Sequence, residues 1–391
     1  MIYSRRMFLR ATGAGVAALG AARGVGARGR EALSHLPPWE RDTQHAASVP
    51  ATAIRLSSNE NPLGPSEATL AAMRAAFAAA NRYPAPSEGA TRAAIARSHG
   101  IPEDSVLLGC GSGEILRMAV FACVAPDRPL VAGAPTFEDP GHYARLLNSD
   151  PIDVPVDNAL RLDLERMGAR ASGAGLVFLC NPNNPTGTVH GGAAITSFVE
   201  RVLALPGSPT VLIDEAYHEY VDDESYRTAV PMALASPRVI VTRTFSKVFG
   251  MAGVRIGYAI ARPATLEALR RHKLGNAVNA FAAAGAIAAL AGTDAIAAER
   301  ARNRTVRQFT REALADMGLE VPASETNFVM ANVRRDVQGV IDACARQGVL
   351  IGRPFPPLTT WARISIGTME EMRRAVSVLR AVIGVPAGAQ I

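Results

Sequence analysis

The chain has 391 residues, of which 48% are hydrophobic and 19% are charged, and its formal net charge is +6. That length and apolar fraction allow a sizeable buried core and fit a soluble enzyme of two domains. Residues 1–30 contain six arginines and no acidic residue, so the remainder balances at 35 basic and 35 acidic side chains. The charge therefore gives no reason to expect a nucleic acid or a membrane surface as a partner. The cysteines and histidines show no spacing typical of a metal site.

The amino-terminal segment Ser4-Arg5-Arg6-Met7-Phe8-Leu9-Arg10 matches a twin-arginine export signal. Residues 11–22 follow as a weakly apolar stretch that is too short and too mild to form a stable membrane span. We expect residues 1–30 to be the signal, the twin-arginine export machinery to be a partner, and the protein to be periplasmic or otherwise exported. If the leader is not used, the segment is the basic start of a cytoplasmic enzyme.

After an arm and a helix predicted for residues 31–80, short apolar runs alternate with helical patterns. This alternation predicts an α/β fold with a mostly parallel sheet and helices on both faces. We assign residues 81–290 to a large cofactor-binding domain built on this sheet. The clearest strand runs are Val106-Leu107-Leu108, Leu130-Val131, Val177-Phe178-Leu179, Val211-Leu212-Ile213 and Val239-Ile240-Val241.

The carboxyl-terminal part, residues 291–391, predicts a smaller α+β domain. An alanine-rich helix at 276–303 is expected to lead into it, because alanine has the highest helix propensity. Strands are expected at 327–330 and 363–366, and the last helix at 369–383.

The first candidate binding loop is Leu107-Leu108-Gly109-Cys110-Gly111-Ser112-Gly113-Glu114, which reads as a strand, a glycine turn and a helix start. Backbone N–H groups at such a helix start attract phosphate, and small residues let the ligand approach. A dinucleotide-binding fingerprint is the rival interpretation, and it fails because the third glycine is missing at the required spacing.

The second loop, Cys180-Asn181-Pro182-Asn183-Asn184-Pro185-Thr186-Gly187, follows the strand run that ends at Leu179. Its two prolines in four positions exclude regular structure and stiffen the loop. That rigidity would let Asn184 present its side-chain amide as a fixed hydrogen-bond donor. An ordinary stiff turn is the alternative.

The third segment, Val211-Leu212-Ile213-Asp214-Glu215-Ala216-Tyr217, places a carboxylate at the end of a buried strand. Such a carboxylate is costly unless it is paired, and a protonated pyridine nitrogen is a suitable partner for Asp214. Tyr217 could then place its hydroxyl near the phenolic oxygen of the same ring. A magnesium-binding aspartate is the alternative, but it requires a phosphate loop ending in Lys-Ser/Thr that the chain lacks.

The most informative segment runs from Arg243 to Tyr258, where Lys247 follows the hydroxyl side chains of Thr244 and Ser246 and is followed by three glycines and Arg255. An amine at a strand end in this setting suits an aldehyde cofactor that carries a phosphate. Lys247 would form the Schiff base, and Thr244, Ser246 and Arg255 would hold the anion. A lone lysine would more often be a solvated surface residue.

From about residue 54 to residue 384 the chain resembles the pyridoxal-phosphate enzymes of the aspartate aminotransferase superfamily. Within the class I/II aminotransferases it most resembles the histidinol-phosphate aminotransferase group. The resemblance implies fold type I, with a mostly parallel seven-stranded sheet in the large domain. The markers are residues 56–65, Arg82-Tyr83-Pro84, Pro135-Thr136-Phe137, residues 181–187, residues 214–217, residues 244–257, Thr326-Asn327-Phe328 and residues 363–368.

The resemblance also implies roles around pyridoxal 5'-phosphate. Lys247 would be the cofactor lysine and the base that moves the proton, and Asp214 would pair with the ring nitrogen. Tyr217 and Asn184 would bond the phenolic oxygen. The ring face would be covered by Phe137, and the phosphate would be bound by Ser112, Gly113, Thr244, Ser246 and Arg255. The family often has an acidic residue at the position of Gly113, so this chain keeps only a backbone contact there.

Substrate and subunit contacts follow from the same resemblance. Arg363 would hold the substrate carboxylate in a bidentate fork, and Asn59 and Arg353 are further substrate-binding candidates. Tyr83 would reach the phosphate of the neighbouring subunit, which implies a homodimer.

The implied activity is transfer of an amino group between an amino acid or amino-phosphate and a 2-oxo acid by a ping-pong mechanism. Histidinol phosphate is the substrate of the most similar group, although a biosynthetic cytoplasmic role would be odd for an exported enzyme. Related pyridoxal-phosphate lyases, such as amino-acid-phosphate decarboxylases, share nearly the same motifs and are the alternative. A non-catalytic cofactor-binding protein is a further alternative that the intact set of Lys247, Asp214 and Arg255 argues against.

Overall fold

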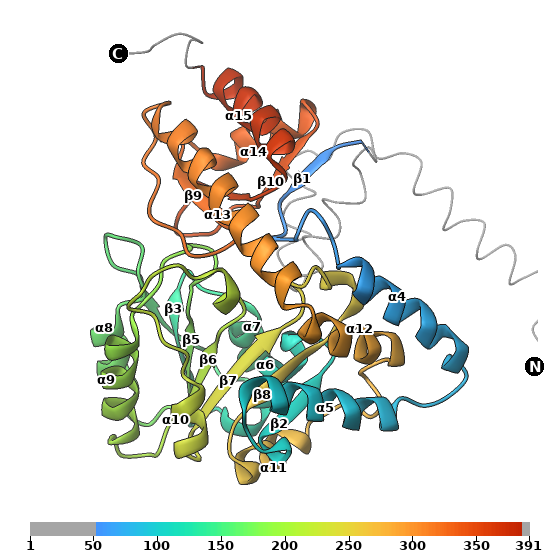
Figure 1. Ribbon diagram of the computed structural model, residues 1–391. Helices are drawn as coiled ribbons and strands as arrows, with labels where there is room; N and C mark the ends of the chain where they lie inside the picture. The colour runs from blue at the N-terminus through green and yellow to red at the C-terminus, as the bar shows by residue number, and fades with distance from the viewer. Residues whose placement is uncertain (1–51, 385–391) are drawn as a thin grey trace, which may run out of the picture. The chain divides into compact units, whose positions relative to one another are not determined.

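The computed structural model describes residues 52–384, and a seven-stranded sheet organises the larger part of them (Figure 1). The strand order is β2-β8-β7-β6-β5-β3-β4. Strand β8 runs antiparallel to its neighbours β2 and β7, whereas the other neighbouring pairs are parallel. The bounds are β2 (Val106–Gly109), β3 (Leu130–Ala134), β4 (Ile152–Pro155), β5 (Leu176–Cys180), β6 (Thr210–Asp214), β7 (Val239–Thr244) and β8 (Gly257–Ile260).

This sheet confirms the expected α/β fold, and all five apolar runs that we singled out are strands in it. The export signal predicted for residues 1–30 lies outside the described residues.

Side chains of the sheet alternate between two apolar cores, as the period of a strand requires. In β5, Leu176 and Phe178 belong to one core, and Val177 and Leu179 belong to the other. The first core is covered by α6 (Ser112–Cys123), α7 (Asp139–Leu146) and α11 (Pro263–Arg270). The second is covered by α5 (Ala85–His99), α8 (Leu164–Arg170), α9 (Gly192–Leu203), α10 (Val230–Ala235) and α12 (Ala280–Ala291). Burial on both faces explains why the strands read as continuous apolar runs.

A separate apolar core forms among the carboxyl-terminal elements. Its strands β9 (Phe328–Asn332) and β11 (Trp361–Ser365) pair antiparallel, and β10 (Val349–Ile351) pairs in parallel with β1 (Ile54–Leu56). The helices are α13 (Thr293–Ala315), α14 (Val337–Arg346) and α15 (Met369–Ile383), the last of which begins with a capping box of Thr368 and Glu371. Leu56 of β1 is buried in this core, so the start of the described chain packs with its end. The predicted domain boundary between residues 290 and 291 stays a prediction.

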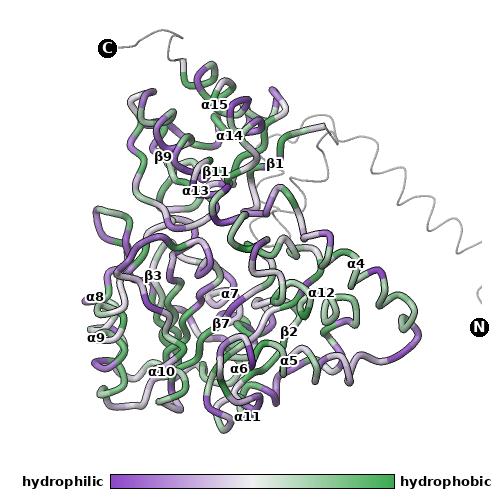
Figure 2. The backbone as a smooth tube through the Cα atoms, in the orientation of Figure 1, coloured by the Kyte–Doolittle hydropathy of each residue, from purple (hydrophilic) through white to green (hydrophobic). Residues whose placement is uncertain are grey.

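The helical segment predicted at 276–303 is confirmed for most of its length, but it consists of two helices that meet at Gly292 with a bend of 80°. The backbone of Gly292, with φ −86° and ψ 55°, lies outside the helical region and separates the two helices, whereas Gly285 is accommodated inside α12. Helix α12 packs on α4 (Glu67–Ala76), and Figure 2 shows α12 in green because its residues are nearly all apolar. Within residues 52–384 no single helix is long and apolar enough to cross a membrane, and only the bent pair of α12 and α13 passes that test together.

Candidate active site

The carboxyl ends of β5, β6 and β7 bring three of the predicted segments to one edge of the sheet. In the register of these parallel strands, Cys180 is opposite Asp214 and Asp214 is opposite Thr242. The backbone N–H of Asn181 donates to the Asp214 carbonyl at 3.0 Å, so the proline-containing loop begins beside Asp214. Open α/β sheets place ligands just beyond such strand ends.

Lys247 follows β7 and points into this region. Its Nζ donates to the carbonyl oxygen of Asn59 at 3.2 Å and lies 5.5 Å from the centre of the Tyr217 ring. Burial, together with the positive charge of Arg363, lowers the pKa of Lys247 to about 8. A lysine with a pKa this low presents far more neutral amine near neutral pH than an ordinary lysine does, and the neutral amine is the nucleophile and base.

Asp214 ends β6 and is only 3% exposed. The hydroxyl of Thr242 donates to its Oδ1 at 2.9 Å. A hydroxyl carries no charge, so this bond does not cancel the charge of the carboxylate. Burial therefore raises the pKa of Asp214 to about 6. A cationic ring nitrogen next to Asp214 would reverse that shift.

A cradle for an anion lies at the start of α6. Arg255 donates through Nη1 to Ser246 Oγ at 3.3 Å, and the Thr244 hydroxyl donates to the same Ser246 oxygen at 2.9 Å. A Cβ on Gly111 would collide with the Arg255 guanidinium, so this glycine, whose φ is +74°, allows Arg255 to lie against the turn before Ser112. Two hydroxyls, a guanidinium and the amides of a helix start are the groups that bind phosphate.

The chain has Gly113 where the family often has an acidic residue, and the structure places another acidic side chain beside this position. The Asp139 carboxylate, at the start of α7, lies 3.8 Å from the position that a Cβ on Gly113 would take. Burial and the neighbouring charge of Glu138 raise the pKa of Asp139 to about 7. An acidic side chain therefore stands beside this turn, although it comes from another element.

The proline-containing loop after β5 is tied to the loop after β3. Thr136 Oγ1 donates to Asn183 Oδ1 at 2.7 Å, and Asn183 Nδ2 donates to the Pro135 carbonyl at 3.1 Å. Phe137, the next residue, packs partly against the core on the α6 side of the sheet. Asn184 accepts a hydrogen bond at its Oδ1 from Arg363, so its Nδ2 is the atom through which it can donate to a ligand.

Arg363 comes from β11 and reaches the same region from the carboxyl-terminal elements. Its Nη1 donates to Asn184 Oδ1 at 2.7 Å and its Nη2 donates to the Ser57 carbonyl at 2.6 Å. The guanidinium lies over the Phe355 ring, with 4.6 Å between Cζ and the ring centre. Arg353 lies 4.4 Å from the centre of the same ring, so the two predicted substrate arginines share Phe355.

Some residues of this region were not anticipated from the sequence. Four side chains contact or face the residues described above, namely Thr242, Glu138, Asp139 and Phe355. Only Glu138 and Asp139 could have been found from the sequence, because they come next in the chain after Phe137. Of the predicted site residues, Tyr83 is not brought to the Lys247 region by any contact described above, and its side chain is 82% exposed.

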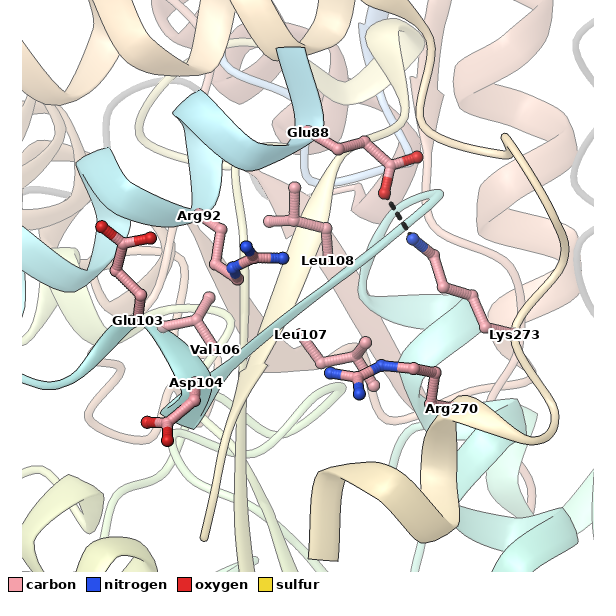
Figure 3. A pocket seen from close by; sticks show the side chains of 9 residues that line it. All are labelled: Glu88, Arg92, Glu103, Asp104, Val106, Leu107, Leu108, Arg270 and Lys273. Carbon is pink, nitrogen blue, oxygen red and sulfur yellow. Dashed lines mark hydrogen bonds and ion pairs between the residues drawn. The ribbon is translucent and has the colours of Figure 1, made fainter. Parts of the chain in front are cut away.

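A surface cavity of about 460 Å³ lies elsewhere, between α5, β2 and the end of α11 (Figure 3). Three cationic and three acidic side chains surround it, including Lys273, which forms an ion pair with Glu88 at 2.5 Å. None of its lining residues belongs to the Lys247 region, so this cavity is separate from the candidate site.

The comparisons with known proteins agree with this geometry. A family model for aminotransferases of class I and II matches residues 51–379. The histidinol-phosphate aminotransferase of Symbiobacterium thermophilum is 37% identical over 334 residues, which cover 85% of this chain and 91% of that protein. The aromatic amino acid aminotransferase of Thermobifida fusca is 35% identical over 352 residues, covering 90% and 96%. The crystal structure of histidinol-phosphate aminotransferase from Sinorhizobium meliloti, in complex with pyridoxal-5'-phosphate, is 28% identical, covers 93% of this chain and 99% of that chain, and superposes with a TM-score of 0.82.

Proposed function

The chain belongs to the class I and II aminotransferase family and is a pyridoxal-phosphate-dependent transaminase, and we propose that the residues around Lys247 are its active site. The observation that carries the assignment is the position of Lys247, an amine with a pKa of about 8 that shares its surroundings with Asp214 and Arg255. Lys247 and Lys273 are the only lysines in the chain, and Lys273 lies at the separate cavity.

The residues present fit this cofactor at each of its ends. The phosphate suits the cradle of Ser112, Thr244, Ser246 and Arg255, where a glycine turn and two hydroxyls meet a guanidinium. A protonated ring nitrogen suits Asp214, whose burial leaves its carboxylate in need of a positive partner. The phenolic oxygen suits Tyr217 and the Nδ2 of Asn184, and Phe137 is the candidate for the ring face.

When bound, pyridoxal phosphate supplies an aldehyde that links to amines and a ring that accepts electrons. Asp214 would hold the ring nitrogen by an ion pair and so keep it positively charged. Arg363 binds the carboxylate of the amino acid and so orients its α-carbon, with Asn184 and the Ser57 carbonyl fixing the guanidinium. Lys247, once the substrate amine has taken its place on the cofactor, would remove the proton from the substrate α-carbon and would deliver it to the cofactor side, which leaves the substrate ready for release as a 2-oxo acid.

The donor is an amino acid or amino-phosphate and the acceptor is a 2-oxo acid. Relatives of nearly equal identity carry different substrate names, histidinol phosphate in one and aromatic amino acids in another. Both substrates have an aromatic ring in the side chain. We propose that the donor is an amino compound of this kind, and that Arg363 holds its carboxylate where it has one.

The experiment is a half-reaction with single donors. Protein loaded with pyridoxal phosphate is mixed with each common amino acid and with histidinol phosphate, and the carbonyl product is measured per active site. About one carbonyl product per site from particular donors supports the proposal and identifies the donor. A loaded protein that yields carbonyl product with none of them would contradict it.

We further propose a homodimer in which Tyr83 binds the cofactor phosphate of the partner. The 82% exposure of Tyr83 supports this, because a large aromatic side chain in water is a common mark of an interface. Leu63, Phe77 and Leu274 are further large apolar side chains that are more than half exposed.

Subunit complementation tests the dimer. In a hybrid of Lys247→Ala and Tyr83→Ala chains, one of the two sites contains both native residues. Mixing and refolding two weakly active variants should therefore restore activity that corresponds to one native site in each hybrid dimer, with none in the two parental dimers. No gain on mixing, or an active monomer in sedimentation, would contradict the shared site.

We also propose that residues 1–30 direct the protein through the twin-arginine machinery, on the basis of Arg5 and Arg6 in their sequence setting. Cell fractionation of the full chain should find it outside the cytoplasm. The double substitution Arg5→Lys and Arg6→Lys should retain it inside the cytoplasm, and equal distribution of both forms would contradict the export route.

A further inference from the structure

Glu138 and Arg353 form an ion pair between two loops that are far apart in the chain. Arg353 Nη2 lies 2.8 Å from Glu138 Oε2, and the side chains are 21% and 34% exposed. Glu138 directly follows Phe137, the candidate for the cofactor ring face. The pair therefore joins the loop that would cover the ring to the loop before β11.

Phe355 connects this pair to the carboxylate-binding residue. The guanidinium carbons of Arg353 and Arg363 lie 4.4 Å and 4.6 Å from the centre of its ring. A substrate whose α-carboxylate is held by Arg363 would thus have Arg353 as the next cation available to a negative group farther along the substrate.

The charge of Arg353 is, however, already balanced. Both partners of the ion pair are more than half buried, where opposite charges attract more strongly than on an open surface. A distal carboxylate or phosphate on the substrate must compete with Glu138 for the guanidinium, and it meets repulsion from Glu138 itself. A side chain without negative charge meets neither cost.

Resting on the proposed function, we propose that Glu138 is a specificity-determining residue, which neutralises Arg353 and so selects donors without a distal negative charge. Glu138 acts through Arg353 and takes no part in the chemical step. The substrate class that follows is donors with uncharged side chains, in preference to amino acids that carry a second carboxylate or a phosphate at the distal end of the side chain.

Glutamate and glutamine test this as a matched pair, since they have the same length and shape and differ in distal charge. Glu138→Gln should raise the ratio of kcat/KM for glutamate over that for glutamine by about tenfold or more, the factor that one charge-assisted hydrogen bond can give. Glu267→Gln is the control, because it breaks an exposed ion pair with Arg270 of 2.6 Å on α11, away from the Lys247 region.

A double variant tests whether Glu138 acts through Arg353. If Glu138 acts through Arg353, adding Glu138→Gln to Arg353→Gln should change the ratio far less than Glu138→Gln does alone. An equal change in both backgrounds, or an unchanged ratio in Glu138→Gln, would overturn the inference.

A binding measurement tests the role of Glu138 without requiring that the protein turn over any donor. Calorimetry with the loaded protein compares glutarate with valerate, which has the same chain length and one carboxylate fewer. Glu138→Gln should tighten glutarate binding by about tenfold and leave valerate unchanged. If no donor is turned over, the proposed function fails, and these two ligands still decide the role of Glu138: equal shifts for both would reject it.

Discussion

Asn59 and Tyr217 lie 158 positions apart in the chain, and the side-chain amide Nδ2 of Asn59 donates to the Tyr217 hydroxyl at 3.1 Å. The same asparagine accepts a hydrogen bond from Lys247 at its carbonyl and one from Ser365 at its Oδ1. The segment after β1 is thereby held to Tyr217 and Lys247, which follow β6 and β7, and to Ser365 of β11. Asn59 consequently orients two of the candidate catalytic groups.

Asn59→Gly should destabilise the protein by about 1–3 kcal/mol, because it removes the hydrogen bonds to buried Tyr217 and Ser365. Asn59 has a φ of 54°, which glycine adopts without strain. Asn59→Ala should cost about 1 kcal/mol more, since alanine adds backbone strain. Urea unfolding of the cofactor-free protein measures both. Equal stability of Asn59→Gly and the native chain would contradict the role of the side chain.

Lys247→Ala should abolish covalent attachment of the cofactor and lower turnover by a factor of about 100 to 10,000, the usual contribution of a positioned proton-transfer group. Borohydride reduction followed by peptide mass analysis locates the attachment. Lys273→Ala is the matched control, because it removes the only other lysine and should leave labelling intact. Label on Lys273 in the native protein would argue against the assignment.

The rate of attachment to cofactor-free protein should rise with pH and level off above about pH 8. The reason is that Lys247 reacts as the neutral amine, and its pKa is lowered to about 8 by burial and by Arg363. Arg363→Gln removes that positive neighbour, so its midpoint should move to higher pH. Stopped-flow absorbance over a range of pH checks this, and a midpoint near that of an ordinary lysine in the native protein would contradict it.

Asp214→Asn should stabilise the cofactor-free protein while weakening its hold on the cofactor. Burial raises the folded-state pKa of Asp214 from 3.8 to about 6, so the folded chain binds more protons than the unfolded chain between these values. Stability is therefore lost as pH rises through that window and stays lost above it. At about 1.4 kcal/mol per pKa unit, the gain from asparagine is of the order of 3 kcal/mol at pH 8 and smaller at pH 5.

Calorimetric melting of both cofactor-free proteins at these two pH values measures the gain, and equilibrium dialysis measures cofactor affinity. Asp127→Asn, at an exposed position, controls for the loss of one charge. A variant that is no more stable at pH 8, or that holds the cofactor as tightly as the native chain, would show that Asp214 is not the buried partner of the ring nitrogen.

Arg363→Gln should lower kcat/KM for amino acids by about a hundredfold or more and leave cofactor binding nearly unchanged. The guanidinium would otherwise form charge-assisted bonds to the substrate carboxylate, each worth about 1.5–3 kcal/mol. Steady-state kinetics and cofactor titration separate the two effects. A large loss of cofactor affinity with intact turnover at saturation would assign Arg363 to the cofactor instead.

The sheet and the chemistry of its edge could be predicted because their signals are local. Strands buried on both faces are short apolar runs, and Asp214 and Lys247 follow such runs directly. Strand β8 was not singled out, since its four residues include a glycine and an alanine and it reverses direction between parallel neighbours. The break at Gly292 was missed because helix propensity was summed over a long alanine-rich window.

Contacts between segments that are far apart in the chain could not be predicted from one sequence. The three-residue strand β1 pairs with β10 nearly 300 residues later, and neither strand is long enough to show a period. The ion pair of Glu138 with Arg353 and the bond of Asn59 to Tyr217 are of the same kind. Such contacts depend on how two cores are placed, which hydrophobic periodicity does not encode.

The central claim is that this site transfers an amino group and leaves the substrate carbon skeleton intact. Loaded protein should be mixed in a single turnover with a responsive amino acid donor, labelled with carbon-13 in its carboxyl group, and the products analysed by mass spectrometry. We predict an equimolar 2-oxo acid that retains the label, with the amino group on the protein-bound cofactor. Labelled carbon dioxide with the corresponding amine, and no 2-oxo acid, would contradict the account and indicate a decarboxylase.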